Sequence, residues 1–281
     1  MDRGRTAPLS LPFGKTGRRR RDRALEVGSS AHYDDAAYYT RAYEKRTEDV
    51  AFWVALAQGV RGPVLEYGVG NGRIALPLAR AGASVVGVDL SKPMLDDLRA
   101  SLASEPAEVR ERVRARRGDM RSLRLGEQFP LVTCTFNTLL HLYERRDFER
   151  FFARVREHLA PGGRFVFDVS TPQPSELARD PERMFRWPRM RHPTRGDIVK
   201  YGERFDYDRV QQTLFVTMLF VPEASPADAW VTPLAHRQLF PRETEALLHY
   251  NGLKVERVYG DYARGPFDSS SDVAIWVCKA R

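Results

Sequence analysis

The sequence predicts an α/β protein: a mostly parallel β-sheet covered by helices, with a smaller antiparallel sheet inserted late in the chain. Between residues 63 and 169, apolar runs alternate with helical patterns in the order β-α-β-α-β-β-α-β. This order is typical of a parallel sheet that binds ligands at the carboxyl ends of its strands. After Thr171, prolines break the alternation, and three strand-like segments follow without helices between them, which indicates antiparallel strands. These segments are 198–207, 213–221 and 230–240.

The composition is that of a globular protein. The chain has 281 residues, 42% of them hydrophobic, enough for one large domain or one domain with an insertion. It has no run of about 18 apolar residues and no signal-peptide core, so we expect neither a membrane span nor secretion. Cys134 and Cys278 lie in apolar, strand-like runs. This favours buried, reduced thiols in a cytoplasmic protein, with a disulfide possible only if the two strands are neighbours.

The net charge of +8 is unevenly distributed. Residues 1–30 hold eight basic and three acidic residues, a balance of +5, which leaves +3 for the rest of the chain. The basic block 18–23 would suit RNA or an anionic surface, but its composition favours a disordered, solvated arm. The nearly balanced remainder does not suggest a nucleic-acid groove.

A helix is predicted over residues 31–58, ahead of the first strand. Apolar and aromatic side chains recur along it with polar residues between them. A tyrosine stripe at helical spacing is more often core than site. The recurring positions are Tyr39, Tyr43, Val50, Phe52, Trp53 and Leu56.

A glycine-rich turn follows the first strand. The apolar run that begins at Pro63 ends at the acid Glu66, the turn holds Gly68, Gly70 and Gly72, and a helical pattern begins directly afterwards. Glycine allows a sharp turn and a close approach by a ligand, and the helix start offers free N–H groups. The alternative is a tight turn between a strand and a helix with no ligand.

A second acid follows the strand at 83–88. Asp89 lies about 20 residues after the glycines, where a carboxylate can accept hydrogen bonds from both hydroxyls of a ribose. A dehydrogenase would carry the same acid, so Asp89 does not discriminate between cofactors. Ser91 caps the next helix, with Pro93 in its first turn. Leu90 and Met94 are candidate neighbours of an adenine, or plain core.

The third strand, 113–117, is short and rich in arginine and leads to Asp119 and Met120. An acid at this place can accept a hydrogen bond from an adenine amino group, although an Asp in a surface turn is common. The fourth strand, 131–136, continues into 137–142, which includes His141. A helix at 147–159 and a strand at 164–169 complete this part of the chain.

The last part of the chain has three more elements. Residues 241–250 predict a helix that Asn251 and Gly252 end. Two strands follow, at 253–260 and 272–279. No internal repeat is visible.

Residues 31–170 resemble the class I S-adenosylmethionine (SAM)-dependent methyltransferases, and within them the small-molecule enzymes similar to glycine N-methyltransferase. The motifs that carry the resemblance are LEYGVGNG at 65–72, VDLS at 88–91, PGG at 161–163 and NTLLHL at 137–142. The last is similar to that group's Gly-Asn-Ser-x-x-His-Leu, with Phe136 in place of the glycine and Thr138 in place of the serine. Arg46 is similar to the arginine that binds the SAM carboxylate in this group.

The resemblance implies a Rossmann-like, doubly wound sheet of seven strands whose last strand is antiparallel. Residues 1–30 are then a basic arm, 31–170 the SAM-binding core with a lid helix, and 171–240 the inserted sheet that shapes the acceptor pocket over the methyl donor. Residues 241–281 complete the core sheet.

The same resemblance implies a set of cofactor contacts, with Glu66 near the amine of SAM, Asp89 at the ribose and Asp119 at the adenine. The full predicted set is Tyr39, Arg46, Glu66, Gly68, Gly70, Asn71, Gly72, Asp89, Leu90, Met94, Asp119, Met120, Phe136 and Asn137. We expect S-adenosyl-L-homocysteine as the product and no metal.

The implied reaction is an in-line attack by an acceptor lone pair on the sulfonium methyl group. Alignment of donor and acceptor contributes up to roughly 7–11 kcal/mol in such reactions. An amine acceptor must be uncharged, so a nearby base helps. His141 is the candidate, and the alternative is a histidine that caps or orients its loop. Tyr33 and Tyr38 are lid candidates, and Tyr201 and Arg237 are candidates for the acceptor pocket.

The acceptor is expected to be a small molecule, at nitrogen rather than oxygen. Two alternatives stay open: an RNA or protein acceptor recognised by the basic arm, and a SAM- or nucleotide-binding protein without catalysis. A nicotinamide dehydrogenase is disfavoured because Arg73 stands in place of the third glycine of a dinucleotide-binding loop. The apolar segment 213–221 would suit a homodimer.

Overall fold

The computed structural model describes residues 25–281 apart from 187, and these form two compact units. The larger unit comprises Thr40–Gln173 and Arg237–Arg281. The smaller unit comprises the described residues up to Tyr39 together with Pro174–His236. The basic block 18–23 lies outside the described residues.

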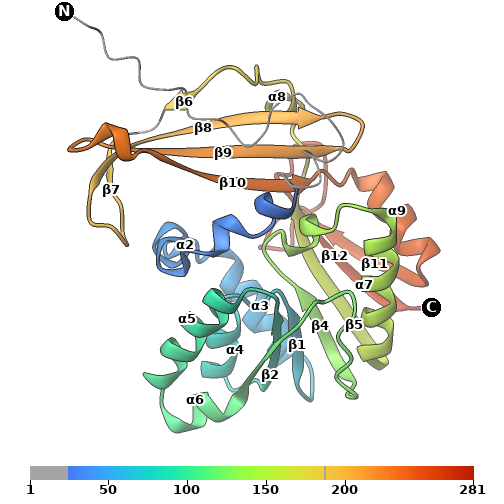
Figure 1. The fold of residues 1–281 in the computed structure, drawn as a ribbon. Coiled ribbons are helices and arrows are strands. Elements are labelled where there is room, and N and C mark those ends of the chain that lie inside the picture. The colour runs from blue at the N-terminus through green and yellow to red at the C-terminus, as the bar shows by residue number, and fades with distance from the viewer. Residues whose placement is uncertain (1–24, 187) are drawn as a thin grey trace, which may run out of the picture. The chain divides into compact units, whose positions relative to one another are not determined.

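The larger unit is built on a seven-stranded sheet with the order β11-β12-β5-β4-β1-β2-β3 (Figure 1). Its strands are β1 (Val64–Tyr67), β2 (Val85–Asp89), β3 (Val113–Arg117), β4 (Phe129–Cys134), β5 (Leu159–Ser170), β11 (Leu253–Tyr259) and β12 (Val273–Ala280). All neighbours pair in parallel except β12, which is antiparallel to both β5 and β11. The predicted Rossmann-like sheet with an antiparallel last strand is confirmed.

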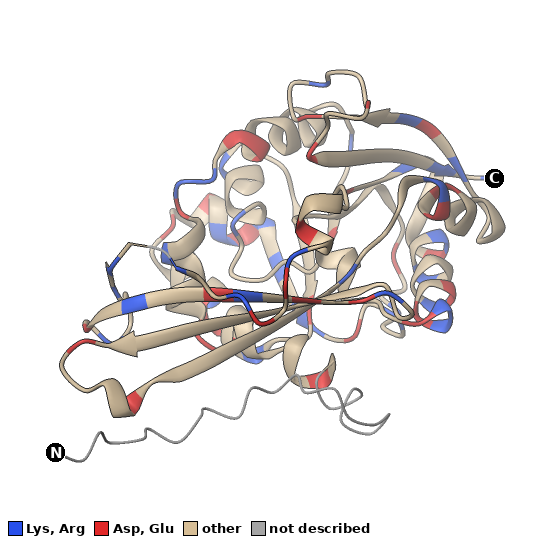
Figure 2. Cartoon of the chain, turned by 90° about the horizontal axis from the view of Figure 1, so that it is seen from above, with Lys and Arg blue, Asp and Glu red and all other residues tan. Residues whose placement is uncertain are grey.

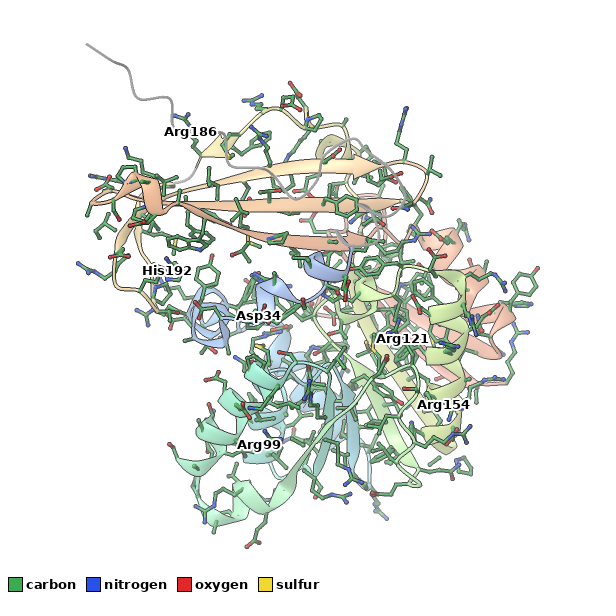
Figure 3. All side chains as sticks on the ribbon, viewed as in Figure 1. Asp34, Arg99, Arg121, Arg154, Arg186 and His192 are labelled. Carbon is green, nitrogen blue, oxygen red and sulfur yellow. The ribbon has the colours of Figure 1, made fainter. Side chains whose placement is uncertain are left out.

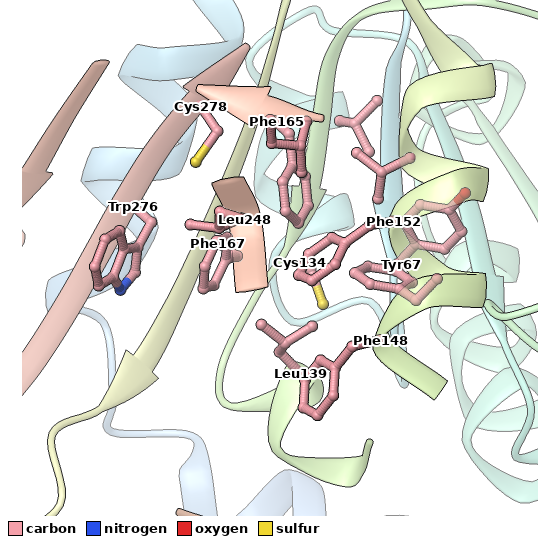
Figure 4. Packing of buried hydrophobic residues seen from close by; sticks show 14 of the residues in the cluster. Tyr67, Cys134, Leu139, Phe148, Phe152, Phe165, Phe167, Leu248, Trp276 and Cys278 are labelled. Carbon is pink, nitrogen blue, oxygen red and sulfur yellow. The ribbon is translucent and has the colours of Figure 1, made fainter. Parts of the chain in front are cut away.

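Helices cover both faces of this sheet, and the pleat of the strands sorts side chains between them. On one face, Tyr67, Cys134 and Phe167 pack with α7 (Arg145–His158) and α9 (Pro241–Tyr250), as Figure 4 shows. On the other, alternate strand positions such as Val64 and Val166 pack with three helices. These are α3 (Glu48–Gln58), α4 (Ala75–Arg80) and α5 (Lys92–Ala103).

Local signals set several helix starts as the sequence predicts. Ser91 caps α5 by accepting the N–H of Met94, with Pro93 in the first turn. Glu144 and Asp147 form a reciprocal capping box at the start of α7. A short helix that the sequence reading missed, α6 (Ala107–Arg112), precedes β3.

The single helix predicted over 31–58 is wrong. The chain forms a 3₁₀ turn, η1 (Ala31–Tyr33), then α2 (Ala36–Tyr43) and α3. Asp35 accepts the N–H of Tyr38 and so begins α2 as a new helix. A turn from Arg46 N–H to the Tyr43 carbonyl ends it. The break matters because it places Arg46 in a connection rather than on a helix face.

The smaller unit is an antiparallel sheet with the order β10-β9-β8-β6, and β7 pairs with β8. Its strands are β6 (Phe185–Arg186), β7 (Met190–Arg191), β8 (Ile198–Asp208), β9 (Thr213–Pro222) and β10 (Trp230–Arg237). The inserted antiparallel sheet is confirmed, but β6 and β7 were not predicted because two-residue strands carry no alternation. The remaining short elements are α8 (Pro174–Leu177), η2 (Thr138–His141) and η3 (Pro226–Asp228).

Both cysteines are buried and free, as predicted. In the part of the chain that the structure describes, no helix has the length and apolar character that crossing a membrane requires. Figure 2 shows Lys and Arg interspersed with Asp and Glu along the described chain.

Candidate active site

The predicted cofactor residues of the larger unit converge on the carboxyl ends of β1, β2 and β4. The sheet order reverses at β1, which lies between β4 and β2, and open α/β sheets bind ligands at such a reversal. The glycine turn begins here. Gly68, Gly70 and Gly72 all have left-handed backbones, with φ of 72°, 53° and 83°.

Two of these glycines are also required by the protein's own packing. A Cβ at Gly68 would lie 2.4 Å from Thr138, and one at Gly72 would lie 2.4 Å from Leu98. At Gly70 a Cβ would meet the terminal methyl of Met94 at 3.1 Å. The turn is therefore fixed by its backbone conformation and by close contact with neighbouring side chains.

Asp89, at the end of β2, is locked onto this turn. One carboxylate oxygen accepts the N–H of Gly70 and the other accepts the N–H of Ser91, each at 2.8 Å. Burial raises the pKa of Asp89, and these N–H groups oppose the shift. Each oxygen keeps a lone pair for a further donor, which fits a carboxylate that receives two ribose hydroxyls. Beside it, Leu90 is 60% exposed while Met94 is buried.

Glu66, at the end of β1, is a buried acid that is only half satisfied. The hydroxyl of Thr135 donates to Oε1 at 3.1 Å. The second oxygen, Oε2, is buried and has no hydrogen-bond partner among the described residues. Burial is the main reason that the pKa of Glu66 is raised to about 8. An unpartnered acidic oxygen of this kind is suited to a cationic donor such as an ammonium group.

A cationic cluster stands between α3 and the turn. Arg73 forms a bidentate pair with Asp49, which is fully buried, and donates to the Arg46 carbonyl. Arg46 and Arg73 lie over the ring of Phe136, 4.7 and 4.6 Å from its centroid. Arg46 Nε is buried, 4.0 Å from Asp49, and lacks a hydrogen-bond partner among the described residues. It is therefore a donor suited to a carboxylate.

The loop after β4 has an unusual backbone. Phe136 and Asn137 both adopt positive φ, 53° and 64°. The Asn137 side chain accepts the N–H of Ser170 at 2.7 Å and donates to its hydroxyl at 3.0 Å, so it fastens this loop to the end of β5. Asn71, on the glycine turn, donates instead to the Thr40 hydroxyl at 2.7 Å.

The predicted adenine acid is paired with an arginine. Arg121, labelled in Figure 3, donates to both oxygens of Asp119 and also to Asp147. Partial burial alone would raise the pKa of Asp119, but the hydrogen bonds from Arg121 hold it below its usual value. Asp119 is thus placed near the end of β3 in an ion pair, and its contact with adenine stays a prediction. Met120 is partly buried against the core.

The candidates for catalysis fall in both units. His141 lies in η2, with Nδ1 3.5 Å from the Tyr143 hydroxyl. Arg237 pairs with Glu243 at the start of α9. Both belong to the larger unit, and their roles toward an acceptor stay predictions.

The predicted tyrosines of the smaller unit sit in an aromatic cluster. Tyr38 stacks on His192 at 5.1 Å, labelled in Figure 3, and meets Phe220 edge-on. Tyr33 and Tyr39 contact each other with ring centroids 5.6 Å apart. Tyr201 packs on Phe220 and donates to Glu203. Within this unit they behave as core side chains; their roles toward cofactor and acceptor stay predictions.

Sequence reasoning missed three polar side chains of the site. The sequence analysis assigned no role in the site to Asp49, Asp168 or Tyr262. Phe136 N–H and the Tyr262 hydroxyl both donate to the carboxylate of Asp168, at 2.7 and 2.8 Å. A signal for Asp168 was present, because an acid within the apolar run of β5 must be paired when it is buried. Tyr262 carried no comparable signal.

Comparisons with known proteins agree with this geometry. Residues 64–163 match the family model described as a methyltransferase domain. The chain is 29% identical over 220 residues to the cypemycin N-terminal methyltransferase of a Streptomyces species, covering 78% of this chain and 84% of that protein.

Two solved structures extend the likeness. One is the CcbJ methyltransferase from Streptomyces caelestis, with a TM-score of 0.74 and 27% identity over 90% of this chain and 98% of that one. The other is the glycopeptide N-methyltransferase MtfA in complex with SAM, with a TM-score of 0.57 and 24% identity over 84% of this chain and 96% of that one. At that identity, the second supports the fold alone.

The domain match, the sheet order and the acid-flanked glycine turn together identify the chain as a class I SAM-dependent methyltransferase. SAM is accordingly its methyl donor. The residues at the carboxyl ends of these strands fit SAM. Two buried atoms described above make no hydrogen bond among the described residues: Glu66 Oε2 suits the ammonium group of its methionine part, and Arg46 Nε suits the carboxylate.

Proposed function

We propose that the chain transfers the SAM methyl group to a nitrogen of a small molecule. The observation that carries the cofactor half is the pair Glu66 Oε2 and Arg46 Nε, a buried acidic oxygen and a buried guanidinium nitrogen that make no hydrogen bond among the described residues. A zwitterionic α-amino acid group satisfies both. The preference for nitrogen is supported by the similarity to the cypemycin N-terminal methyltransferase.

In this proposal the chain's residues bind and orient the two reactants. Asp89 receives the ribose hydroxyls, Glu66 the ammonium and Arg46 the carboxylate of the donor. The bound donor supplies an activated methyl group, so the protein's work is alignment and exclusion of water. His141 accepts a proton from the acceptor amine, directly or through Tyr143. The contacts of Tyr33, Tyr38, Tyr39, Tyr201 and Arg237 with the cofactor or the acceptor stay predictions.

An RNA or protein acceptor is not favoured by the described residues. Arginines are numerous, but many are paired with acids, as Arg80 is with Glu105 and Arg114 with Glu127. A phosphate-binding stripe would require unpaired cations. The basic block 18–23 is outside the described residues, so deletion of residues 1–24 with unchanged turnover on a small amine would support the small-molecule assignment.

The test combines binding and transfer. The purified chain is titrated with S-adenosylhomocysteine by calorimetry, and methyl-labelled SAM is supplied with matched panels of small amines, alcohols and carboxylic acids. We expect saturable binding and label in amines only. Asp89→Ala should weaken binding by about 100-fold, since it removes two charge-assisted hydrogen bonds. Asp96→Ala, a surface acid paired with Lys92 and Arg99, is the matched control and should bind as the parent does.

Three results would overturn the proposal. Absence of binding by the parent chain would refute the cofactor site. Label that enters alcohols but no amines would refute transfer to nitrogen. Binding without any transfer, across the panels and a metabolite extract, would favour a non-catalytic SAM-binding protein.

A further inference from the structure

Two polar side chains, one buried and one partly buried, lie near the cofactor edge, the carboxyl ends of β1, β2 and β4, without a role in the reaction described above. Asp168 is on β5 and Tyr262 follows β11, 94 positions later in the sequence. By the alternation of β5, Asp168 points to the same face of the sheet as Val166, the face that α3 covers. The ring of Tyr262 also packs there, 6.0 Å from Phe52 of α3.

Asp168 holds a strained peptide. Its Oδ1 accepts the N–H of Phe136 at 2.7 Å, and Phe136 has a φ of 53°. A bulky residue in that left-handed region is strained and persists only where its surroundings impose it. The adjacent Asn137 is left-handed as well and is held by Ser170, so β5 fastens both strained residues. The backbone of this loop is thus set by the end of β5.

The strained peptide positions the Phe136 ring, which contacts Arg46 and Arg73. The guanidinium groups of Arg46 and Arg73 lie over the Phe136 ring, 4.7 and 4.6 Å from its centroid. The face of an aromatic ring attracts a cation placed over it. Any rotation of the Phe136 peptide would therefore move the surface on which Arg46 rests.

Tyr262 holds the other oxygen of Asp168. Its hydroxyl donates to Asp168 Oδ2 at 2.8 Å, while Oδ1 accepts the Phe136 N–H. Both oxygens of Asp168 are therefore engaged, and the orientation of the carboxylate that holds the Phe136 peptide depends on Tyr262.

We propose that Asp168 and Tyr262 are positioning residues for the amino acid end of the cofactor. Tyr262 orients the Asp168 carboxylate, Asp168 fixes the Phe136 peptide, and the Phe136 ring supports the Arg46 guanidinium that faces a carboxylate. Neither residue touches the adenosine part, which the Asp89 side of the edge binds. This inference rests on the proposed function, in which Arg46 receives the donor's carboxylate.

The test compares two ligands that differ only at that end. S-Adenosylhomocysteine carries the amino acid group, whereas 5′-methylthioadenosine keeps the adenosine and sulfur without it. Tyr262→Phe keeps the ring and removes the hydroxyl that donates to Asp168. We expect it to weaken binding of S-adenosylhomocysteine about tenfold in calorimetry and to change the binding of methylthioadenosine less than twofold. With SAM as substrate, KM should rise about as much while kcat stays near the parent value.

Matched variants separate positioning from loss of structure. Tyr250→Phe makes the same chemical change at a side chain that is 86% exposed and should leave both affinities unchanged. Asp168→Asn retains an oxygen for the Phe136 N–H but presents an amide to the Tyr262 hydroxyl, so we expect a loss confined to S-adenosylhomocysteine. A thermal melt of each variant reports whether the fold is kept.

The outcomes distinguish the inference from the proposed function. Equal weakening of both ligands by Tyr262→Phe, or no weakening of either, would overturn the positioning role. If the parent chain binds neither ligand, the cofactor site itself fails. If the parent binds the two ligands with equal affinity, the amino acid end makes no contact, and both the role of Arg46 and this inference are refuted.

Discussion

The two halves of the cofactor edge are built in different ways. On the adenosine side, Asp89 accepts N–H groups from Ser91, two residues away, and from Gly70, 19 residues away. On the amino acid side, Asp49 pairs with Arg73 across 24 positions, Asp168 holds Phe136 across 32, and Tyr262 reaches Asp168 across 94. The first half is organised by a motif and its spacing. The second exists only once distant segments have packed.

Removal of the Arg73 guanidinium should give the largest effect. Arg73→Met leaves the carboxylate of Asp49, which is fully buried, without its bidentate partner. Breaking a buried pair from one side costs about 3–5 kcal/mol, so we expect the free energy of unfolding in urea to fall by that amount.

A surface pair provides the control. Arg114→Met breaks the pair with Glu127, whose side chains are 60% and 42% exposed, and should cost less than about 1 kcal/mol. If the two variants were equally stable, the distant half would not depend on its buried ion pair, and the contrast between the halves would be lost.

Glu66 lies where the two halves of the cofactor edge meet, and its substitution should have an intermediate effect. Because the pKa of Glu66 is about 8, its carboxyl is protonated at pH 7 in the free protein. An ammonium group placed against it favours the carboxylate, so binding of S-adenosylhomocysteine should release up to one proton. Calorimetry in buffers of different ionisation enthalpy measures this release.

The variant and the second ligand make the measurement specific. Glu66→Gln resembles the protonated acid, so its stability at pH 7 should match the parent while its affinity for S-adenosylhomocysteine falls about tenfold and its proton release disappears. Methylthioadenosine, which has no ammonium, should release no proton from the parent. Proton release with that ligand would show that another group titrates.

The smallest effect concerns the core beneath both halves. His158 is buried, its Nε2 accepts the N–H of Leu125 at 3.1 Å, and its Nδ1 lies 2.6 Å from the Tyr67 hydroxyl. Since Nε2 is an acceptor, Nδ1 carries the proton and donates to Tyr67. Burial lowers the pKa of His158 in the folded state.

A lowered pKa means that the unfolded chain binds the proton more readily. The stability that neutral His158 contributes is therefore complete above its unfolded pKa of about 6.5 and is lost as the pH falls below that value. We expect the melting temperature to drop between pH 7 and pH 5. His158→Gln, which does not titrate, should flatten this part of the profile; an unchanged slope would assign the dependence to other groups, such as buried His32, whose pKa is about 4.

The sequence predicted those features that depend on neighbouring residues. The strand, glycine turn and helix around 64–80, the acid after β2 and the cap at Ser91 follow from local pattern, and so does the parallel order. The seven-stranded count and the role of Arg46 came from family resemblance. Both are predictions made from the sequence.

What could not be predicted depends partly on local competition between helix and turn, and partly on contacts between distant strands. The break in the 31–58 helix requires the Asp35 cap and the turn at Arg46, which compete with good helix-forming residues on either side. Asp168 and Tyr262 meet only because β12 lies between β11 and β5 in the sheet. The glycines at 68 and 72 were attributed to a ligand, whereas Thr138 and Leu98 also require them.

The pairing of β12 with β5 has a consequence for how the enzyme matures. Ser170 lies opposite Val273 and Asp168 opposite Ile275, so β12 sets the register of the two residues that fasten the Phe136 loop. The contacts of Asp89 lie within residues 70–91, which are synthesised early, whereas the register of Asp168 and Ser170 depends on Val273–Ala280, which is synthesised much later. The amino acid half of the edge is therefore completed only after β12 has paired with β5.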